Sequence, residues 1–431
     1  MALSGRTGLL ALLGALLVGV LAPSWWGLLG VEAVLAVLVA IDVALAGTVR
    51  GLRITRSGDT SVRLGERATT TLTVGNPGTR PVRGVLRDAW PPSAGALTQR
   101  HALTIPPGER RRVVTDLVPT RRGDRPAHQV TVRAYGPMRL AARQGSHAVP
   151  WRLRVLPPFG SRKHLPSRLA RLRELEGRTL VMVRGQGTEF DNLREYVVGD
   201  DVRSIDWRAS ARAADVMVRT WRPERDRHVV VVLDTGRTSA GRVGDAPRLD
   251  AAMDAALLLA ALASRAGDRV DLLAYDRRVR ARVEGVGPAE LLAALVQAMA
   301  PLEPELVEPD YAGLVRTVLS RVRRRALVVL LTGLDAAPVE EGLLPVLEPL
   351  VRRHQVLLAS VGDPRVEQLR HGRGDAGAVY DAAAAERSGA DRRWVTDALR
   401  RRGVEVVDAP PEDLPPALAD RYLALKAAGR L

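Results

Sequence analysis

Two long apolar runs dominate the first fifty residues and are the plainest pattern in the chain. They cover about residues 8–23 and 27–49. The second run is long enough to cross a hydrocarbon core of about 30 Å, which takes about 20 helical residues. Trp25 and Trp26 lie between the runs and suit a membrane–water interface. The pattern therefore predicts that residues 1–50 form a transmembrane helical hairpin that anchors the protein in the lipid bilayer.

Basic residues flank this hairpin on one side only. Arg6 precedes the first run, Arg50, Arg53 and Arg56 follow the second, and the tip between them carries no base. Positive flanks stay on the cytoplasmic side of a membrane, so we expect a cell-membrane protein with two transmembrane helices and cytoplasmic soluble domains. The alternative is a signal peptide cleaved near Ala22, but no A-x-A site precedes the tryptophans and the second span would still anchor the chain.

Two acids interrupt the second apolar run. An acid inside a membrane span is a candidate for a proton or ion path. Glu32 lies near the outer end and Asp42 near the inner end. We therefore expect both carboxylates to reach the interface or to pair within an oligomer.

Residues 51–157 change to short alternating runs that end at turn residues. The run 69–74 alternates apolar and polar side chains and stops at Gly75. Further runs of strand type cover residues 112–118, 129–133 and 151–156. Strands at this spacing predict a β-sandwich without a catalytic site.

Residues 228–431 alternate apolar strands with helical segments. Near-continuous apolar strands separated by helices are typical of a parallel, doubly wound α/β sheet. The expected strands cover residues 229–233, 270–275, 326–331, 355–361 and 404–407. The predicted fold class is thus multidomain, with a helical hairpin, a β-sandwich and an α/β domain.

Residues 158–227 join these domains and contain a linker helix followed by a dense charged segment. We call residues 190–226 the charged box. It mixes acids and arginines with a few large apolar side chains, which is too apolar for a linker. The residues that we assign to an interaction motif are Arg194, Glu195, Tyr196, Gly199, Asp200, Asp201, Arg203, Asp206, Trp207, Arg208 and Trp221.

The charged box has four interpretations. Pairing is the usual fate of dense mixed charge, so an ion-pair network comes first. A partner surface comes second, with Trp207, Trp221 and arginines as anchors. Third is a catalytic or metal site built from carboxylates, namely Glu195, Asp200, Asp201 and Asp206. Nucleic acid comes last, because the acids would cancel the attraction. We expect Trp207 to face inward.

The order R-E-Y-x-x-G-D-D-x-R-x-I-D-W in the box, followed by an apolar strand, resembles the family called domain of unknown function 58. The resemblance implies that residues 228–431 form a von Willebrand factor type A-like domain. It also implies a partner, because such proteins often accompany MoxR-type AAA+ ATPases. We therefore expect a membrane-anchored cytoplasmic scaffold or adaptor, not an enzyme, that works with such an ATPase in envelope-related assembly. The alternatives are a metal-dependent hydrolase that uses the box acids, and a structural scaffold without an ATPase partner.

The same resemblance implies a Mg²⁺ site in an Asp-x-Ser-x-Ser loop after the first strand. Here the loop contains Asp234 and Thr238, but Gly236 replaces the first serine and Arg237 adds a cation. Mg²⁺ requires several hard oxygen ligands in near-octahedral geometry. We therefore expect no cofactor and no tightly bound metal, and retain Asp234, Thr238 and Asp335 as a degenerate candidate loop.

The composition of the chain excludes several kinds of chemistry and makes one kind of partner less expected. The chain has no cysteine, which excludes disulfides and thiolate chemistry. The net charge of +16 comes mostly from arginines dispersed along the chain, so it does not indicate a nucleic-acid partner. Lys163 and Lys426 are the two lysines and neither follows a glycine, which excludes a Walker-type P-loop.

Overall fold

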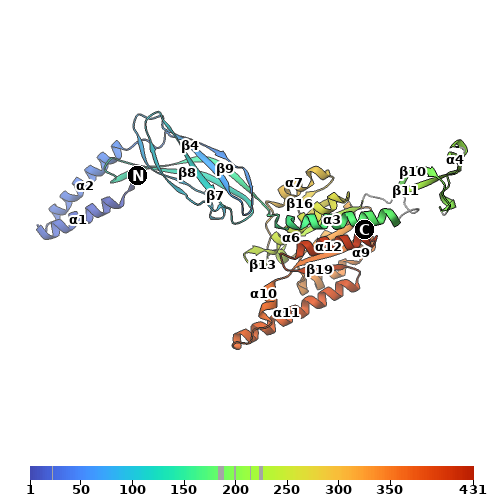
Figure 1. Ribbon diagram of the computed structural model, residues 1–431. Coiled ribbons are helices and arrows are strands. Elements are labelled where there is room, and N and C mark those ends of the chain that lie inside the picture. The colour runs from blue at the N-terminus through green and yellow to red at the C-terminus, as the bar shows by residue number, and fades with distance from the viewer. Residues whose placement is uncertain (22, 183–188, 199, 214, 223–226) are drawn as a thin grey trace. The chain divides into compact units, whose positions relative to one another are not determined.

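The computed structural model describes residues 1–21, 23–182, 189–198, 200–213, 215–222 and 227–431. The chain is multidomain and mixes helices and sheets (Figure 1). It forms two compact units, Met1–Leu156 and Pro157–Leu431. Each unit is described by itself below.

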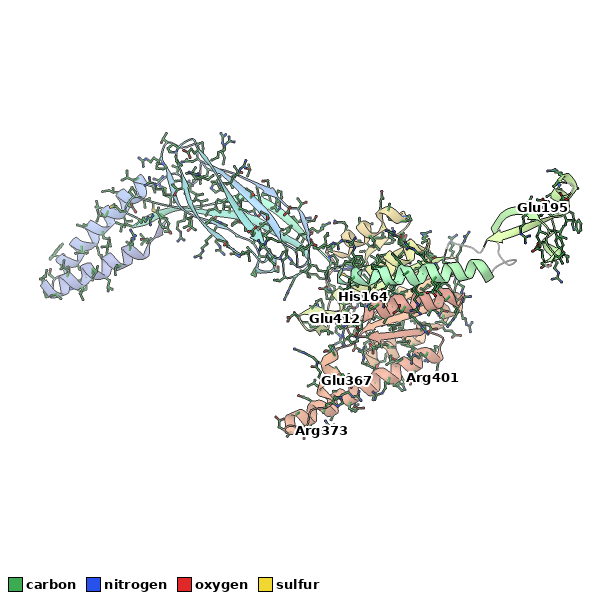
Figure 2. The ribbon with its side chains drawn as sticks, viewed as in Figure 1. His164, Glu195, Glu367, Arg373, Arg401 and Glu412 are labelled. Atoms are coloured by element: carbon green, nitrogen blue, oxygen red, sulfur yellow. The ribbon has the colours of Figure 1, made fainter. Side chains whose placement is uncertain are left out.

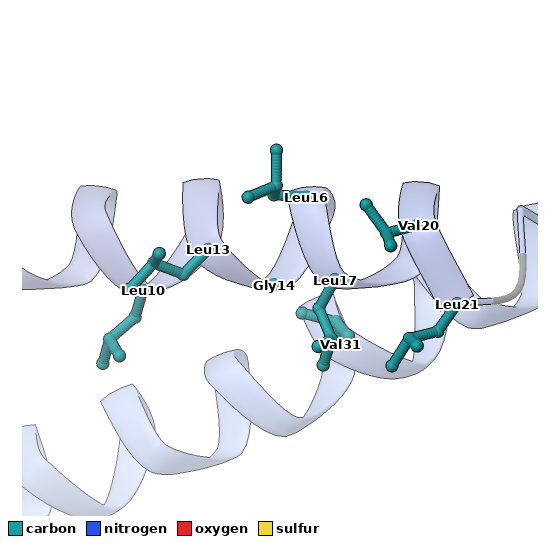
Figure 3. Close-up of a pocket in the computed structure, with 8 residues that line it drawn as sticks. All are labelled: Leu10, Leu13, Gly14, Leu16, Leu17, Val20, Leu21 and Val31. Atoms are coloured by element: carbon teal, nitrogen blue, oxygen red, sulfur yellow. The ribbon is translucent and has the colours of Figure 1, made fainter.

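The first unit begins with two apolar helices that lie side by side (Figure 1). After the short strand β1 (Ala2–Leu3) come α1 (Gly5–Leu21) and α2 (Trp25–Leu45). Within the described residues, α2 is the one helix both long and apolar enough to cross a membrane, and α1 is a shorter apolar helix. Gly14 of α1 faces Val31 of α2, and a Cβ at Gly14 would collide with the valine (Figure 3). The glycine therefore permits the close approach of the two helices.

The rest of this unit is a β-sandwich made of two sheets. The larger sheet has the order β1-β9-β8-β5-β6 with β3 beside β9, and the smaller sheet has the order β2-β4-β7. The strands and one short helix are β2 (Arg53–Gly58), β3 (Ser61–Arg63), β4 (Ala68–Gly75), β5 (Val82–Asp88), η1 (Pro92–Ala94), β6 (Arg100–Ile105), β7 (Arg110–Leu117), β8 (Gly123–Tyr135) and β9 (Ala141–Leu156). Alternate residues of β4 are buried, as the sequence pattern predicts for a strand with one face on the core. Both sheets contribute to one apolar core, for example Leu72 and Val113 from the smaller sheet and Leu86 and Val132 from the larger.

A buried ion pair links the two sheets. Arg56 on β2 and Asp88 on β5 are both buried, with 2.7 Å between guanidinium nitrogen and carboxylate oxygen. Asp88 also accepts hydrogen bonds from the Trp90 indole nitrogen at 2.9 Å and the Thr115 hydroxyl at 3.2 Å. The Arg56 guanidinium lies over the Trp90 ring, 5.1 Å from its centroid. Three donors thus satisfy this buried carboxylate, which the strand pattern does not predict.

Asp42 does not behave as the sequence suggested. The expectation that it reaches the interface or pairs in an oligomer is wrong for this unit, because the side chain is fully buried. Its Oδ1 accepts the backbone N–H of Met138 at 2.8 Å, and its Oδ2 accepts those of Leu140 at 2.8 Å and Ala141 at 2.9 Å. Met138 and Leu140 lie in the turn between β8 and β9, and Ala141 begins β9. The acid near the end of α2 therefore satisfies three N–H groups of a sandwich turn, which holds the helix on the sandwich.

The second unit contains a six-stranded sheet with the order β16-β15-β12-β17-β18-β19. Its strands are β12 (His228–Asp234), β15 (Arg269–Tyr275), β16 (Val279–Val283), β17 (Leu327–Leu331), β18 (Gln355–Val361) and β19 (Glu405–Ala409). Neighbouring strands are parallel except at the edge, where β16 is antiparallel to β15. The nearly continuous burial of β12, β17 and β18 fits a sheet covered on both faces.

Helices cover both faces of this sheet. On one face α6 contacts β12, β15 and β18, and α12 contacts β18, β19 and α6. On the other face, one apolar core joins side chains of the sheet to side chains of α8, α9 and α11. The helices and minor elements of the unit are η2 (Gly160–His164), α3 (Leu165–Met182), α5 (Arg237–Ala240), β13 (Arg242–Val243), β14 (Ala246–Pro247), α6 (Arg248–Arg265), α7 (Pro288–Met299), α8 (Tyr311–Arg321), η4 (Pro338–Leu343), η5 (Leu344–Val346), α9 (Glu348–Arg353), α10 (Pro364–Leu369), α11 (Ala376–Arg401) and α12 (Leu414–Ala427).

The helices α10 and α11 fold back on each other as an arm. Arg370 pairs with Glu367 at 2.8 Å and with Glu386 of α11 at 2.6 Å, which holds the two helices together. Figure 2 shows Arg373 at the tip of this arm, and Arg401 at the other end of α11.

Candidate functional site

The charged box folds as a two-stranded antiparallel hairpin, in which β10 (Glu189–Glu195) pairs with β11 (Met217–Arg222). Figure 2 labels Glu195 on this hairpin. The connection between the strands contains η3 (Val202–Ser204) and α4 (Trp207–Ala213). Asp206 starts α4, because one of its carboxylate oxygens accepts the backbone N–H groups of Arg208 and Ala209, each at 3.0 Å. We call the described part of residues 189–222 the box hairpin.

Two acids of the box hairpin form ion pairs and hydrogen bonds within the hairpin itself. Asp200 pairs with Arg194 at 2.6 Å and accepts the backbone N–H of Val197 at 3.0 Å. Asp206 pairs with Arg219 at 2.8 Å, in addition to its bonds within α4. The Ala209 N–H bond, together with Arg219, lowers the pKa of Asp206. Each of these two carboxylates thus has its own arginine partner, as an ion-pair network requires.

Trp207 faces outward, so the expectation that it faces inward is wrong. Its side chain is 71% exposed. The preceding apolar residue, Ile205, is half-buried and pairs through its backbone with the buried Val218. Alternation of a strand would place 205 and 207 on one face, but the helix α4 begins at Trp207 and breaks that alternation.

Other apolar side chains of the box hairpin are exposed as well. Val198 is 94% exposed and Val202 is 63% exposed. Arg203 and Arg208 are also exposed, whereas Tyr196 is half-buried and its backbone N–H donates to Val216 at 2.7 Å. Indole, aliphatic and guanidinium groups are therefore all presented by one small element.

The structure does not group the remaining members of the interaction motif at one point of the box hairpin, within the residues that it describes. Asp201 caps η3 by accepting the backbone N–H of Arg203 at 3.0 Å, and Glu195 is exposed. Gly199 lies outside the described residues, and for Trp221 only the backbone is described, opposite Phe190. In the part of the chain that the structure describes, no three acid or histidine side chains are grouped to share a metal. The four box acids proposed for a hydrolase are not such a group.

A second polar site lies at the carboxyl end of β12, in the other part of this unit. β12 has β15 on one side and β17 on the other, so the order of strands reverses here. Ligands of open α/β sheets bind at this kind of position. Asp234 ends β12 and is only 3% exposed. Its Oδ1 accepts the Gly236 N–H at 2.7 Å, and its Oδ2 accepts the hydroxyls of Thr238 and, at 2.6 Å, Thr332.

Three further members of this polar site, Thr332, Tyr311 and Asp276, are not among the residues that we predicted for the loop. The Thr332 hydroxyl follows the apolar strand β17, and the buried Tyr311 hydroxyl lies 3.1 Å from it. On the other side, the Asp276 carboxylate follows β15 and accepts the Thr235 hydroxyl at 3.2 Å. A polar residue directly after a buried parallel strand is a usable sequence signal for Thr332 and Asp276. Tyr311 begins α8 and carries no such signal.

Electrostatics at this site disfavour negative charge. Burial raises the pKa of Asp234, even though three hydrogen-bond donors oppose that shift. Burial and then the neighbouring Asp234 raise the pKa of Tyr311. The site therefore holds a carboxylate whose charge is only partly compensated.

The candidate metal loop is only partly assembled. Asp234 and Thr238 are in contact, but the half-exposed Asp335 pairs with the Arg248 guanidinium at 3.3 Å. A Cβ at Gly236 would lie 3.0 Å from both Pro309 Cγ and the Val307 carbonyl, so a serine there would be crowded. One buried carboxylate and two hydroxyls supply too few charged ligands for Mg²⁺. The residues present do not fit a tightly held Mg²⁺.

The second unit is thus an open, mostly parallel α/β domain with a polar site at its switch point and a charged hairpin. Residues 192–406 match the family described as "Protein of unknown function DUF58". This match confirms the resemblance to that family for this segment, which includes most of the box hairpin and the switch-point site.

Curated relatives match less than half of the chain. The chain is 27% identical over 197 residues to "Uncharacterized protein Rv1480" of Mycobacterium tuberculosis (strain ATCC 25618 / H37Rv), which is 45% of this chain and 61% of that protein. "Uncharacterized protein Mb1516" of Mycobacterium bovis (strain ATCC BAA-935 / AF2122/97) matches with the same values. The chain thus spans about three fifths of the length of these relatives.

Solved structures show only weak likeness. The CARDB domain of the PF1109 protein from Pyrococcus furiosus has 16% identity and a TM-score of 0.19, over 24% of this chain and 91% of that chain. An exo β-N-acetylglucosaminidase from Vibrio harveyi has 10% identity and a TM-score of 0.19, over 83% and 81%. No conclusion about fold or function follows from such scores.

Proposed function

We propose that this protein is a membrane-anchored cytoplasmic scaffold or adaptor that binds partner proteins through the box hairpin. The observation that carries this proposal is the exposed Trp207 on an element whose acids Asp200 and Asp206 are already paired. Tryptophan and arginine dominate the binding energy of protein interfaces, and acids that are satisfied internally do not need a substrate or metal to explain them. Protein recognition therefore accounts for the box better than catalysis does.

The finer fold proposal is that residues 228–431 form a von Willebrand factor type A-like domain. Its support is a parallel sheet with one antiparallel edge strand, and a buried aspartate at the end of the first strand. In this proposal the domain works without a tightly bound metal, because Asp335 forms an ion pair with Arg248 and the residue at position 236 is a glycine without a hydroxyl. Partner binding then falls to surfaces outside the loop, of which the box hairpin is one.

The proposed partner is a MoxR-type AAA+ ATPase, and the proposed setting is envelope-related assembly at the cell membrane. The length and apolar character of α2 support the anchor. Insertion of α1 as a second span, and the cytoplasmic side, rest on the arginines that flank the helix pair. A scaffold without an ATPase partner is the competing proposal, and the binding experiment below separates the two.

The test compares two exposed aromatic residues of the same unit. Trp207→Ala should leave the melting temperature nearly unchanged, because truncating an exposed side chain changes stability by about 0.5 kcal/mol or less. It should weaken binding to the purified MoxR-type ATPase by about 2 kcal/mol or more, roughly 30-fold, as expected for a central anchor. The control is Tyr380→Ala on α11, whose side chain is 78% exposed. Its binding should stay close to that of the unaltered protein.

Biolayer interferometry with the full chain in detergent, with and without ATP, measures these affinities. Arg208→Glu gives a second test, since reversal of an exposed charge beside Trp207 should weaken the same complex without unfolding the protein. If Trp207→Ala and Tyr380→Ala bind equally well, the box hairpin is not the surface. If the unaltered protein does not bind the ATPase, the scaffold without an ATPase partner is correct.

A further inference from the structure

One turn of the sandwich holds both ends of the α1–α2 helix pair. The turn is residues 136–140, between β8 and β9. Asp42, near the end of α2, accepts three backbone N–H groups of Met138, Leu140 and Ala141. At the start of α1, the Thr7 hydroxyl and the Ser4 N–H, the latter at 2.9 Å, both donate to the Leu140 carbonyl. These hydrogen bonds therefore fix the sandwich directly against the helix ends.

The length of α2 sets the depth of this turn in a membrane. With 21 residues, α2 is about 31 Å long at about 1.5 Å per residue, which matches a hydrocarbon core of about 30 Å. If the exposed Trp25 and Trp26 lie at one interface, the end of α2 lies at the other. Because the 136–140 turn binds Asp42, it lies at the level of the lipid headgroups. The partly exposed side chain of Met138 lies at its tip.

Arginines from separate parts of the sequence lie close to this level. Arg139 lies within the turn, with a left-handed backbone at φ 56°. Arg6 directly precedes Thr7, and Arg50 directly follows Val49. The Arg80 guanidinium donates to the Ala44 carbonyl, and Arg143 Nε donates to the Val43 carbonyl at 2.9 Å. Arg6, Arg50, Arg80 and Arg139 are exposed and Arg143 is half-buried.

The acids at this level do not cancel this charge. Asp42 is fully buried and its two oxygens face three N–H groups. Glu109, on the turn between β6 and β7, lies 3.9 Å from Arg111. A ring of positive charge at headgroup depth fits phosphate groups, to which guanidinium binds with two parallel hydrogen bonds.

We propose that Arg6, Arg50, Arg80, Arg139 and Arg143 form a basic collar that binds the phosphates of anionic phospholipids around the base of the helix pair. The collar holds the 136–140 end of the sandwich against the leaflet and thereby sets the orientation of the sandwich to the bilayer. The inference rests on the proposed membrane anchoring and adds to it a preference for anionic lipid. It is separate from the positive flanks read from the sequence, because Arg80, Arg139 and Arg143 reach this level only through the fold.

The experiment measures lipid selectivity of the full-length protein in phosphatidylcholine vesicles. Electron paramagnetic resonance compares spin-labelled phosphatidylglycerol with spin-labelled phosphatidylcholine at the protein surface. We expect phosphatidylglycerol to associate about threefold more strongly, with the preference falling towards one at about 1 M salt, where the Debye length is about 3 Å.

Two double variants test the assignment. Arg80→Gln with Arg139→Asn should reduce the preference to near one, and asparagine tolerates the left-handed backbone at position 139. The control is Arg67→Gln with Arg121→Gln, which removes the same amount of positive charge. Arg67 precedes β4 and Arg121 follows β7, at the end of these paired strands that is far from the collar. This control should keep the preference.

Flotation of the vesicles separates the two levels of the proposal. A protein that does not float with phosphatidylcholine vesicles overturns both the anchor and the collar. A protein that floats but shows no preference for phosphatidylglycerol overturns the collar alone. The collar is also overturned if the Arg80→Gln, Arg139→Asn variant keeps the preference for phosphatidylglycerol, or if the Arg67→Gln, Arg121→Gln control loses it.

Discussion

At the scale of single residues, Asp234 shows how the fold alters an ordinary side chain. It ends a buried strand, so its carboxylate is removed from water while two hydroxyls and one N–H donate to it. Hydrogen bonds offset only part of the cost of burying a charge. The site therefore stores a destabilising charge in the position where an α/β sheet binds ligands, which is a common feature of functional sites.

The first prediction concerns this charge and pH. Burial raises the pKa of Asp234 above 3.8, so the folded state binds its proton more tightly than the unfolded state does. Asp234 therefore makes its full contribution to the free energy of unfolding below pH 3.8. This contribution is lost as the pH rises through the raised pKa of the folded state. Asp234→Asn should remove this fall and raise the melting temperature at pH 7–8 by a few degrees, since about 1 kcal/mol shifts it by about 2–4 °C.

Differential scanning fluorimetry across pH, with the full chain in detergent, measures this effect. Asp335→Asn is the control, because Asp335 is half-exposed and paired with Arg248. The Asp335→Asn variant should show only a small shift in melting temperature, without the same dependence on pH. A lower melting temperature for Asp234→Asn at neutral pH would mean that the negative charge itself is required there, as in a metal site.

At the scale of elements, polar contacts decide how strands and sheets meet. The Arg56–Asp88 pair joins β2 to β5 across the sandwich, where apolar alternation alone sets only which face of each strand is inside. A buried pair with satisfied lone pairs orients the two sheets, and removal of one partner leaves the other charge without compensation.

The second prediction follows from that pair. Asp88→Ala should lower the free energy of unfolding of the sandwich by about 3–5 kcal/mol, because it leaves the Arg56 guanidinium buried without its carboxylate. Asp116→Ala is the matched control, since Asp116 is half-buried and accepts one hydrogen bond from Thr69 at 3.1 Å. It should cost about 1 kcal/mol or less.

Hydrogen exchange of peptides from β2 and β5 under increasing urea measures the loss within the sandwich itself. Similar losses in the Asp88 and Asp116 variants would show that the buried pair does not stabilise the contact between the sheets.

At the scale of the whole molecule, we propose that the arrangement of charge along the first unit sets the orientation of this unit to a membrane. Arg6 and Arg50 lie on either side of the helix pair, and the tip between the helices carries no basic residue. Basic residues next to a span are retained in the cytoplasm. Both ends of the pair also contact one sandwich turn, so they lie on one side of any bilayer that the helices cross.

The third prediction is the resulting topology. A fluorescent protein fused after Leu431 should fluoresce, and alkaline phosphatase fused there should be inactive, as expected for a cytoplasmic terminus. A fusion at Ser24, in the tip, should give the reverse pattern. Active phosphatase at Leu431 would overturn the orientation. A cytoplasmic pattern at both Leu431 and Ser24 would mean that the helix pair does not cross the membrane as a hairpin.

Local periodicity was enough to predict most elements of this protein. Apolar runs of membrane length, alternation in β4, and buried parallel strands such as β17 each follow from the residues of one segment. The box was recognised because its motif is continuous in sequence. The first half of α11 is rich in alanine and mostly exposed, so it lacks the periodic apolar face from which the start of a helix can be predicted.

Only the tertiary structure decided which distant polar groups meet. Asp42 contacts residues 138–141, Asp88 contacts Arg56, and Asp234 contacts Thr332, and no period in the sequence encodes these pairs. The same holds for Trp207, whose outward direction depends on where α4 begins. Hydrophobic burial has a regular local pattern, whereas the satisfaction of buried polar groups depends on chain segments that are brought together by folding.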